Sequence, residues 1–135
     1  MRGAVVALGV ALVSCAREGG AHREEGTRVV RAIDAVIAAN DGAKATPLAA
    51  LEATPCSDPP ACLARDTCVG AFRPLVASVA LKDEVRAAIR APGAAASVDA
   101  MQAKVDAADA AQRDAAAKMD GCLRAAADAR KAYRQ

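Results

Sequence analysis

Apolar residues recur at helical spacing along most of the chain, which predicts an all-α protein. The first clear stripe lies between Thr27 and Asn40, where apolar positions three and four apart alternate with charged ones. Asn40-Asp41-Gly42 is a typical helix stop, so the first helix is expected over residues 27–40. The residues that form its apolar face are Val29, Val30, Ile33, Val36 and Ile37.

The next two helices are predicted from their starts. Thr46-Pro47 fits an N-cap followed by proline at the first helical position, and predicts a short helix to Ala53. Ser57-Asp58-Pro59-Pro60 is a second start of this kind, and its helix should reach about Ala91, with a kink or break near residues 70–73 because Pro74 lies inside it. The residues expected to be buried by these two helices are Leu48, Leu51, Leu63, Phe72, Leu75, Val76, Val79, Val85 and Ile89.

The last predicted helix has the most regular pattern. Ser97 is expected to cap it, and it should run to about Tyr133, a length of ~55 Å. Ala91-Pro92-Gly93 precedes it, so two long helices should pack antiparallel in a small, disulfide-stabilised up-down bundle of three to four helices. Its heptad-like seam is filled mostly by alanine: Val98, Met101, Val105, Ala108, Gln112, Ala115, Met119 and Cys122.

The composition agrees with a small helical domain that has a thin core. The 135 residues include 39 alanines, and the only aromatic residues are Phe72 and Tyr133. A hydrophobic content of 54% is too high for a typical disordered chain, and the scarcity of strand-forming residues argues against a β-sandwich. A formal charge of +2 is too small to indicate binding to nucleic acid.

The N-terminal segment is apolar but too short to span a membrane. After Met1-Arg2, the stretch Gly3–Val13 runs for eleven residues without a polar side chain. As a helix it would rise only ~16 Å, against a hydrocarbon core of ~30 Å. This length is typical of the apolar region of a signal peptide, with a buried N-terminal helix as the alternative.

Leu12-Val13-Ser14-Cys15 resembles the lipobox of bacterial lipoproteins. The resemblance implies that residues 1–14 are a signal peptide cleaved before Cys15, and that Cys15 carries acyl chains. Because Ala16 rather than aspartate follows, it also implies sorting to the bacterial outer membrane, facing the periplasm. An ordinary secretory signal followed by a chance cysteine is the alternative. Residues 15–26, charged and rich in glycine, are then expected to be a flexible tether that includes the single histidine, His22, and residues 27–135 the bundle domain.

Four cysteines remain besides Cys15, and an even number in an exported chain is typical of two disulfides. If the long helices are antiparallel about Pro92-Gly93, residues whose numbers sum to about 188 lie opposite each other across the hairpin. This geometry favours a Cys68–Cys122 disulfide and leaves Cys56 to pair with Cys62. Cys62 misses the level of Cys122 by only four residues, so the other connectivities stay open. The C-x5-C-x5-C spacing without histidine does not match a zinc site, so no metal is expected.

No group of residues in the sequence indicates catalysis. With His22 in a tether, no Ser–His or Cys–His pair can be placed in the fold, and no glycine-rich phosphate loop or haem motif is present. We therefore expect no enzyme, no catalytic residue, no cofactor and no small-molecule substrate. The acidic residues of the last helix lack EF-hand spacing and are expected to form a solvated face: Asp99, Asp106, Asp109, Asp114 and Asp120.

A basic cluster near the end of the chain suits the C-terminal end of a helix dipole, with a site for anionic lipid or glycan as the alternative. Its members are Arg124, Arg130, Lys131 and Arg134.

Two functions follow from these expectations. The first is a lipid-anchored periplasmic binding or adaptor module that presents a face to another envelope protein. The second is a structural spacer, because the stretch from Gln102 to Arg134 is similar to the alanine-rich murein lipoprotein of outer membranes. That family ends in a lysine that is joined to peptidoglycan, whereas this chain has Gln135 at its last position. If the alanine content reflects base composition alone, the seam has no partner and the domain is a monomer.

Overall fold

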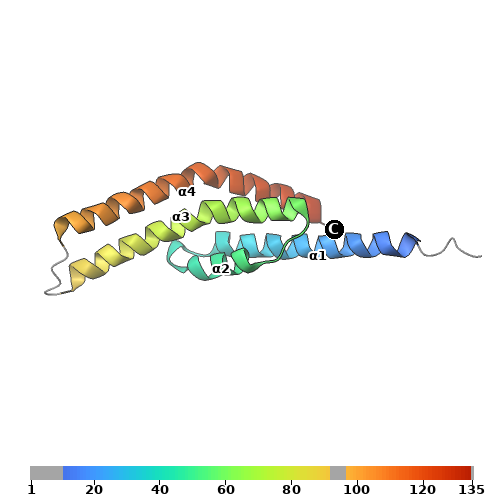
Figure 1. Ribbon diagram of the computed structural model, residues 1–135, viewed down its shortest axis with the longest axis horizontal. Coiled ribbons are helices and arrows are strands. Elements are labelled where there is room, and N and C mark those ends of the chain that lie inside the picture. The colour runs from blue at the N-terminus through green and yellow to red at the C-terminus, as the bar shows by residue number, and fades with distance from the viewer. Residues whose placement is uncertain (1–10, 92–96, 135) are drawn as a thin grey trace, which may run out of the picture.

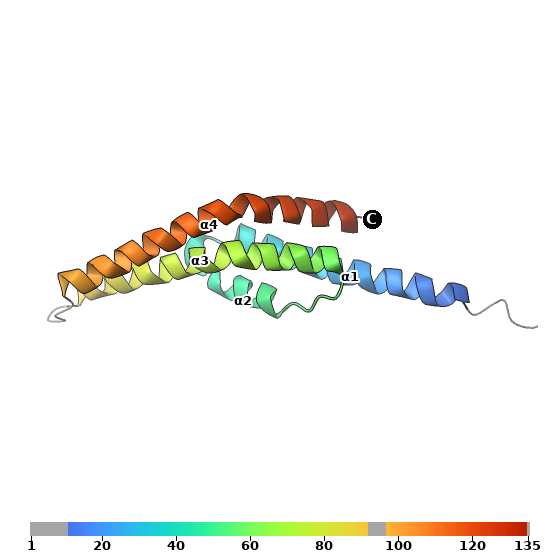
Figure 2. The same ribbon diagram turned by 45° about the horizontal axis from the view of Figure 1, so that its top comes forward.

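The computed structural model describes residues 11–91 and 97–134 and folds into helices joined by short loops (Figure 1). Its elements are α1 (Ala11–Ala38), the 3-10 helix η1 (Asp41–Ala43), α2 (Ala45–Ala53), α3 (Pro59–Arg90) and α4 (Val98–Tyr133). α3 and α4 form a long antiparallel hairpin, and α1 and α2 pack against one half of it (Figures 1 and 2). The predicted helical bundle is therefore confirmed, while the turn at Pro92-Gly93 and residues 1–10 lie outside the described residues.

Small side chains close the hairpin along the predicted seam. The buried residues of α4 are Ala108, Ala115, Cys122, Ala126 and Ala129, and those of α3 are Ala61, Ala64, Cys68, Ala71, Phe72 and Ser78. Because the distance between packed helices depends on the side chains at the contact, alanine allows a close approach. Two predicted seam residues are exposed instead: Val98 begins α4 beyond the reach of α1 and α2, and Gln112 accepts a surface hydrogen bond from Lys82.

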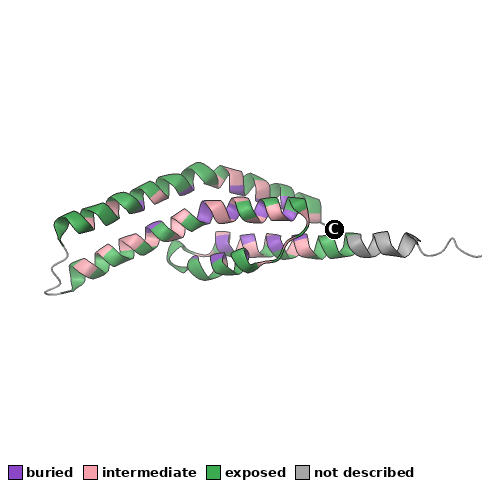
Figure 3. Cartoon of the chain, viewed as in Figure 1, coloured by how far each residue is buried: buried purple, intermediate pink, exposed green. Residues whose placement is uncertain are grey.

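The apolar core lies in the half of the hairpin that α1 and α2 cover (Figure 3). There the predicted stripe of the first helix is confirmed, and the two leucines of α2 are buried as expected. Two residues of α3 that were predicted to face inward do not. Ile89 is 70% exposed at the uncovered end of the hairpin, and Leu63 is 66% exposed on the face of α3 that α1 and α2 leave open. The buried residues of α1 and α2 are Val29, Ile33, Val36, Leu48 and Leu51.

The helix starts are only partly as predicted. Ser97 caps α4, because its side chain accepts a hydrogen bond from the backbone N–H of Ala100 at 3.1 Å. α2 begins at Ala45 with Lys44 as its N-cap residue, so the N-cap predicted at Thr46 is wrong. α3 begins at Pro59 as predicted, but the side chain of Asp58 does not cap it.

Lys44 connects the end of α1 to α2. Its ammonium group is buried and donates to the backbone carbonyl oxygens of Val36, at 2.9 Å, and of Ala39. It also lies 5.7 Å from the centre of the Phe72 ring. Carbonyl groups in the last turn of a helix have no partner within the helix. Lys44 therefore caps α1 from the loop that follows it.

α3 continues through Pro74 without interruption, so of the predicted kink or break, the break does not occur. Proline at this position removes the N–H that would bond the carbonyl of Gly70, and its ring crowds that carbonyl. Contact with α4 continues on both sides and holds the backbone helical. Figure 1 shows that α3 bends in its middle and that α4 bends with it.

The segment predicted as a tether, residues 16–26, is helical and forms the first part of α1. The sequence predicted a flexible tether there, and Glu25 and Gly26 at its end have contacts with other parts of the bundle that local composition does not encode. α1 ends at Ala38, two residues before the predicted stop. None of the helices in the described ranges has both the length and the apolar character needed to cross a bilayer.

The two disulfides join the pairs that the sequence favoured. Cys68–Cys122 links α3 to α4 across the hairpin, with Cα atoms 4.5 Å apart. Cys56–Cys62 closes a short loop around the start of α3, with Cα atoms 5.4 Å apart. Both separations lie in the ordinary range for disulfides. One bond therefore fixes the register of the hairpin, and the other fixes the entry of the chain into α3.

Candidate functional site

Three segments that are distant in sequence meet at the end of the bundle where α1 reaches the hairpin. They are residues 22–26 of α1, the loop before α3, and the last turn of α4. Figure 1 shows the corresponding ends of α3 and α4 beside α1. We refer to the six residues that make these contacts as the junction cluster: His22, Glu25, Gly26, Ser57, Asp58 and Tyr133.

Glu25 caps α3 from outside that helix. Its carboxylate accepts hydrogen bonds from the backbone N–H groups of Ser57 and Asp58, the latter at 2.7 Å, and from the Ser57 hydroxyl at 2.8 Å. N–H groups at a helix start have no partner within the helix. The hydrogen bonds from the backbone of Asp58 and then Ser57 favour the ionised carboxylate and hold the pKa of Glu25 at about 2, below its usual 4.5.

Asp58 is therefore free to bind groups from the other two segments. The Tyr133 hydroxyl donates a hydrogen bond to one carboxylate oxygen of Asp58, and Nδ1 of His22 lies 3.7 Å from the other. Burial of the phenol, followed by the hydrogen bond to Asp58, raises the pKa of Tyr133 to about 12. His22 was expected to be a solvated tether residue, and it is half exposed but lies beside Asp58.

Gly26 permits the close approach of α1 and α4. The ring of Tyr133 lies directly against its backbone, so that a Cβ atom at position 26 would overlap the ring. Glycine is the residue that lets another group approach the backbone this closely. Tyr133 is thus held by Gly26 on its ring and by Asp58 on its hydroxyl.

The hydrogen bonds of the junction cluster define what it can do. The Ser57 hydroxyl donates to Glu25, while His22 faces Asp58, so these two side chains do not form a Ser–His pair. The cluster instead joins α1, α3 and α4 through the carboxylates of Glu25 and Asp58. Glu25 and Gly26 were not foreseen from the sequence, since no local pattern indicates a partner more than thirty residues away.

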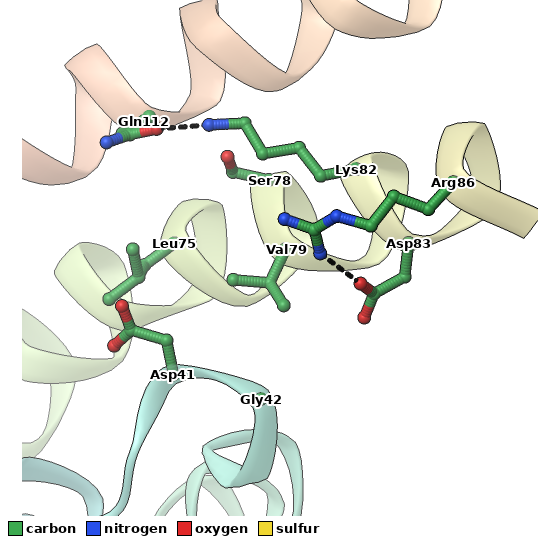
Figure 4. Close-up of a pocket in the computed structure, with 9 residues that line it drawn as sticks. All are labelled: Asp41, Gly42, Leu75, Ser78, Val79, Lys82, Asp83, Arg86 and Gln112. Carbon is green, nitrogen blue, oxygen red and sulfur yellow. Dashed lines mark hydrogen bonds and ion pairs between the residues drawn. The ribbon is translucent and has the colours of Figure 1, made fainter.

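A second concave site lies between η1, α3 and α4 and has a volume of about 350 Å³ (Figure 4). Its charged groups are already paired: the Lys82 ammonium lies 2.5 Å from the Gln112 amide oxygen, and Arg86 lies 2.6 Å from Asp83. Asp41 faces this space from η1. Two cations balanced by two carboxylates give the cleft no preference for ligands of one charge.

An apolar groove of about 390 Å³ runs between α3 and α4 on the face that α1 and α2 leave open. Leu63 stands at its edge and is the large apolar side chain of the groove. Its other lining residues are Pro60, Ala64, Thr67, Gly121, Ala125, Asp128, Ala129 and Ala132. Most of the lining residues are small, which leaves room for the side chains of another helix or protein surface.

The acidic residues predicted to form a solvated face of α4 make surface contacts. Asp109 lies 3.6 Å from Lys82, and Asp114 lies 2.7 Å from Lys118. Among the side chains that the structure describes, those of residues 19–91 and 97–134, no three His, Cys, Asp or Glu come together in a way that could hold a metal ion.

Cys15, the predicted lipidation site, belongs to α1, and its side chain lies outside the part of the chain whose side chains the structure describes. Comparison with protein-family profiles, curated proteins and solved structures finds no match to this chain.

Proposed function

We propose that the protein is a lipid-anchored helical binding module of the bacterial cell envelope. The observation that carries this proposal is the sequence Leu12-Val13-Ser14-Cys15 at the end of an eleven-residue apolar run. In the lipoprotein family, the cysteine of this motif receives acyl chains after cleavage of the leader. Two or more lipid chains anchor a protein stably to a membrane. The bundle would then be held on the periplasmic side of the outer membrane.

The course of α1 supports an anchor that is firmly joined to the bundle. α1 continues from the Cys15 position to Ala38, and the junction cluster fixes residues 22–26 of this helix to α3 and α4. From Cys15 to Gly26 the helix rises ~16 Å. A lipid on Cys15 would therefore hold the bundle close to the membrane at the end where the junction cluster lies.

The groove between α3 and α4 supports the binding role. It is apolar, lies on the face that α1 and α2 leave open, and has the exposed Leu63 at its edge. Contiguous apolar surface that remains exposed commonly marks a protein interaction site, and here the apolar lining of the groove and Leu63 are contiguous. We assign this groove to another protein of the envelope, whose apolar side chains would cover Leu63.

The direction of α4 favours a binding module over the spacer that was the alternative. α4 packs along α3 over most of its length and returns Tyr133 to the end where α1 reaches the hairpin. A spacer between membrane and cell wall needs its two attachment points at opposite ends. In this fold Gly26, near the start of the bundle domain, lies against Tyr133 in the last turn of α4.

Mass spectrometry of the protein purified from membranes without reduction tests the anchor. We expect an N-terminal peptide that begins at Cys15 and carries acyl chains, and a Cys15→Ser variant that lacks them and leaves the membrane fraction. A protein that keeps Met1 and has no acyl chain would overturn the proposal.

Site-specific photocrosslinking in intact cells tests the groove. A crosslinking residue at position 63 should give one discrete adduct with an envelope protein, and the same residue at position 50, exposed on α2, should not. Leu63→Glu should abolish a complex that Ala50→Glu leaves intact. The absence of an adduct at position 63, or the same adducts at both positions, would contradict the assignment of this face.

A further inference from the structure

A small basic cavity lies between α1 and α4, close to the junction cluster. Its volume is about 170 Å³, and its lining residues are Thr27, Val30, Arg130, Tyr133 and Arg134. Val30 and the ring of Tyr133 supply apolar surface, and the two arginines supply positive charge. Arg130 is held in place by Asp34 of α1, whose carboxylate accepts from Nε at 3.1 Å and also from Nη2.

Further arginines extend this cavity into a basic edge. Arg23 and Arg31 lie one helical turn before and after Thr27 on α1, and both are exposed. We call Arg23, Arg31, Arg130 and Arg134 the basic edge. Asp34 offsets one of these charges, and the carboxylates of Glu25 and Asp58 lie on the junction-cluster side, where they accept hydrogen bonds from that cluster. Glu24, which precedes Arg28 by four residues, has the spacing of a helical ion pair with Arg28.

An exposed leucine lies on the same face as the arginines of α4. Leu123 is 45% exposed and precedes Arg130 by seven residues, which places the two side chains on one face, two turns apart. Arginine beside exposed leucine and a half-buried tyrosine is the composition of surfaces that lie in the headgroup region of a bilayer.

We propose that the basic edge docks onto the phosphate headgroups of an anionic phospholipid surface. This inference rests on the proposed function, because an acylated Cys15 would place the basic edge beside a membrane. From Cys15 to Thr27 the helix rises ~18 Å. With α1 lying along the surface, the arginines come within the ~8 Å over which charges act at physiological salt. The planar guanidinium donates two parallel hydrogen bonds to a phosphate, and the cavity between Arg130 and Arg134 receives the headgroup.

The test uses the full chain with Cys15→Ser, so that acyl chains do not contribute, and vesicles with and without phosphatidylglycerol. The variant Arg23→Gln/Arg31→Gln/Arg134→Gln keeps the Arg130–Asp34 pair. The matched control Arg90→Gln/Lys104→Gln/Arg113→Gln removes the same charge from the other half of the hairpin, where all three residues are exposed. The apolar leader is identical in every variant, so the ratio of binding to anionic and neutral vesicles isolates the charge effect.

Each basic residue near an anionic leaflet strengthens binding about fivefold. The triple variant of the basic edge should therefore lose about 100-fold of its preference for anionic vesicles, whereas the control should lose less than about fivefold. Circular dichroism checks that both variants keep their helix content, and Arg134→Gln alone should give about a fivefold loss.

Three results would overturn the inference. They are equal binding to neutral and anionic vesicles, equal losses in the two triple variants, and complete competition by inorganic phosphate, which would assign the cavity to a free anion. The proposed function fails separately. If the native protein is not acylated but its vesicle binding depends on the basic edge, the inference stands and the proposed anchor fails. If the protein is acylated but its vesicle binding does not depend on the basic edge, the anchor stands and the inference fails.

Discussion

The hydroxyl of Tyr133, in the last turn of α4, donates a hydrogen bond to the carboxylate of Asp58 at the start of α3, 75 positions earlier in the chain. Around this contact, Glu25 caps α3 and Gly26 receives the Tyr133 ring. The end of the bundle near the proposed anchor is therefore held by a few side chains whose individual contributions can be measured.

The native protein should lose stability at alkaline pH, and Tyr133→Phe should lose less. The folded protein raises the pKa of Tyr133 from 10 to about 12, so it holds this proton more tightly than the unfolded chain does. The resulting stability is complete below pH 10 and is lost as the pH rises to about 12. Denaturant unfolding across this range should show the loss in the native protein and less of it in Tyr133→Phe. Since the chain has one tyrosine, tyrosinate absorbance reports the titration directly, and a midpoint near 10 would contradict the prediction.

Glu25→Gln should flatten the acid side of the stability profile. The pKa of Glu25 is about 2 in the folded protein against a usual 4.5, so the unfolded chain binds the proton more tightly. Its contribution is present above pH 4.5 and is lost as the pH falls towards 2. The exposed neighbour Glu24→Gln is the matched control. The same acid dependence in native protein and Glu25→Gln would show that Glu25 does not cap α3.

Gly26→Ala should destabilise the protein by about 1–3 kcal/mol, because the added methyl overlaps the Tyr133 ring. Gly20→Ala, in the same helix with no atom within 4 Å of the added Cβ, should instead stabilise by up to ~1 kcal/mol. In the background Tyr133→Ala the cost of Gly26→Ala should disappear, which a double-mutant cycle measures. Independent effects of the two substitutions would show that the ring does not meet Gly26.

The two disulfides should differ in how much each contributes to the free energy of unfolding. Cys68–Cys122 joins residues 54 positions apart, and Cys56–Cys62 joins residues 6 apart. A disulfide stabilises mainly by constraining the unfolded chain, and more so for a longer loop. Replacing the Cys68–Cys122 pair by alanine should therefore lower the free energy of unfolding by about 4 kcal/mol, and replacing the Cys56–Cys62 pair by about 2 kcal/mol. Denaturant midpoints of the two double variants provide the comparison. A larger loss for the short loop would mean that local geometry, rather than chain entropy, sets these contributions.

Lys44→Met should cost about 1–3 kcal/mol, because it keeps most of the buried stem but leaves the carbonyl oxygens at the end of α1 without their donor. Lys104→Met, which breaks the exposed pair with Glu84, should cost less than about 1 kcal/mol. Equal losses in thermal or denaturant unfolding would argue against a capping role for Lys44.

The amino-acid sequence by itself determined most of the helical segments and much of their pairing. The apolar stripe of α1, the Ser97 cap and the ends of α3 and α4 depend on residues within a few positions of each other, so local patterns encode them. Antiparallel counting favoured the observed cysteine pairing without excluding the others, since a fixed rise per residue makes level positions predictable only to within about a turn. The lipobox at Cys15 is also a local pattern, and acylation there stays a prediction.

Only the tertiary structure decided the junction cluster, the cap that Lys44 gives to α1, and the exposure of Leu63 and Ile89. Periodicity indicates which face of a helix is apolar, but not how far a neighbouring helix extends to cover it. Likewise, the carboxylate of Glu25 meets the start of α3 only after the chain has turned back through α2. Such contacts depend on the relative placement of whole helices, which is fixed by the sum of their packing and not by any short stretch of sequence.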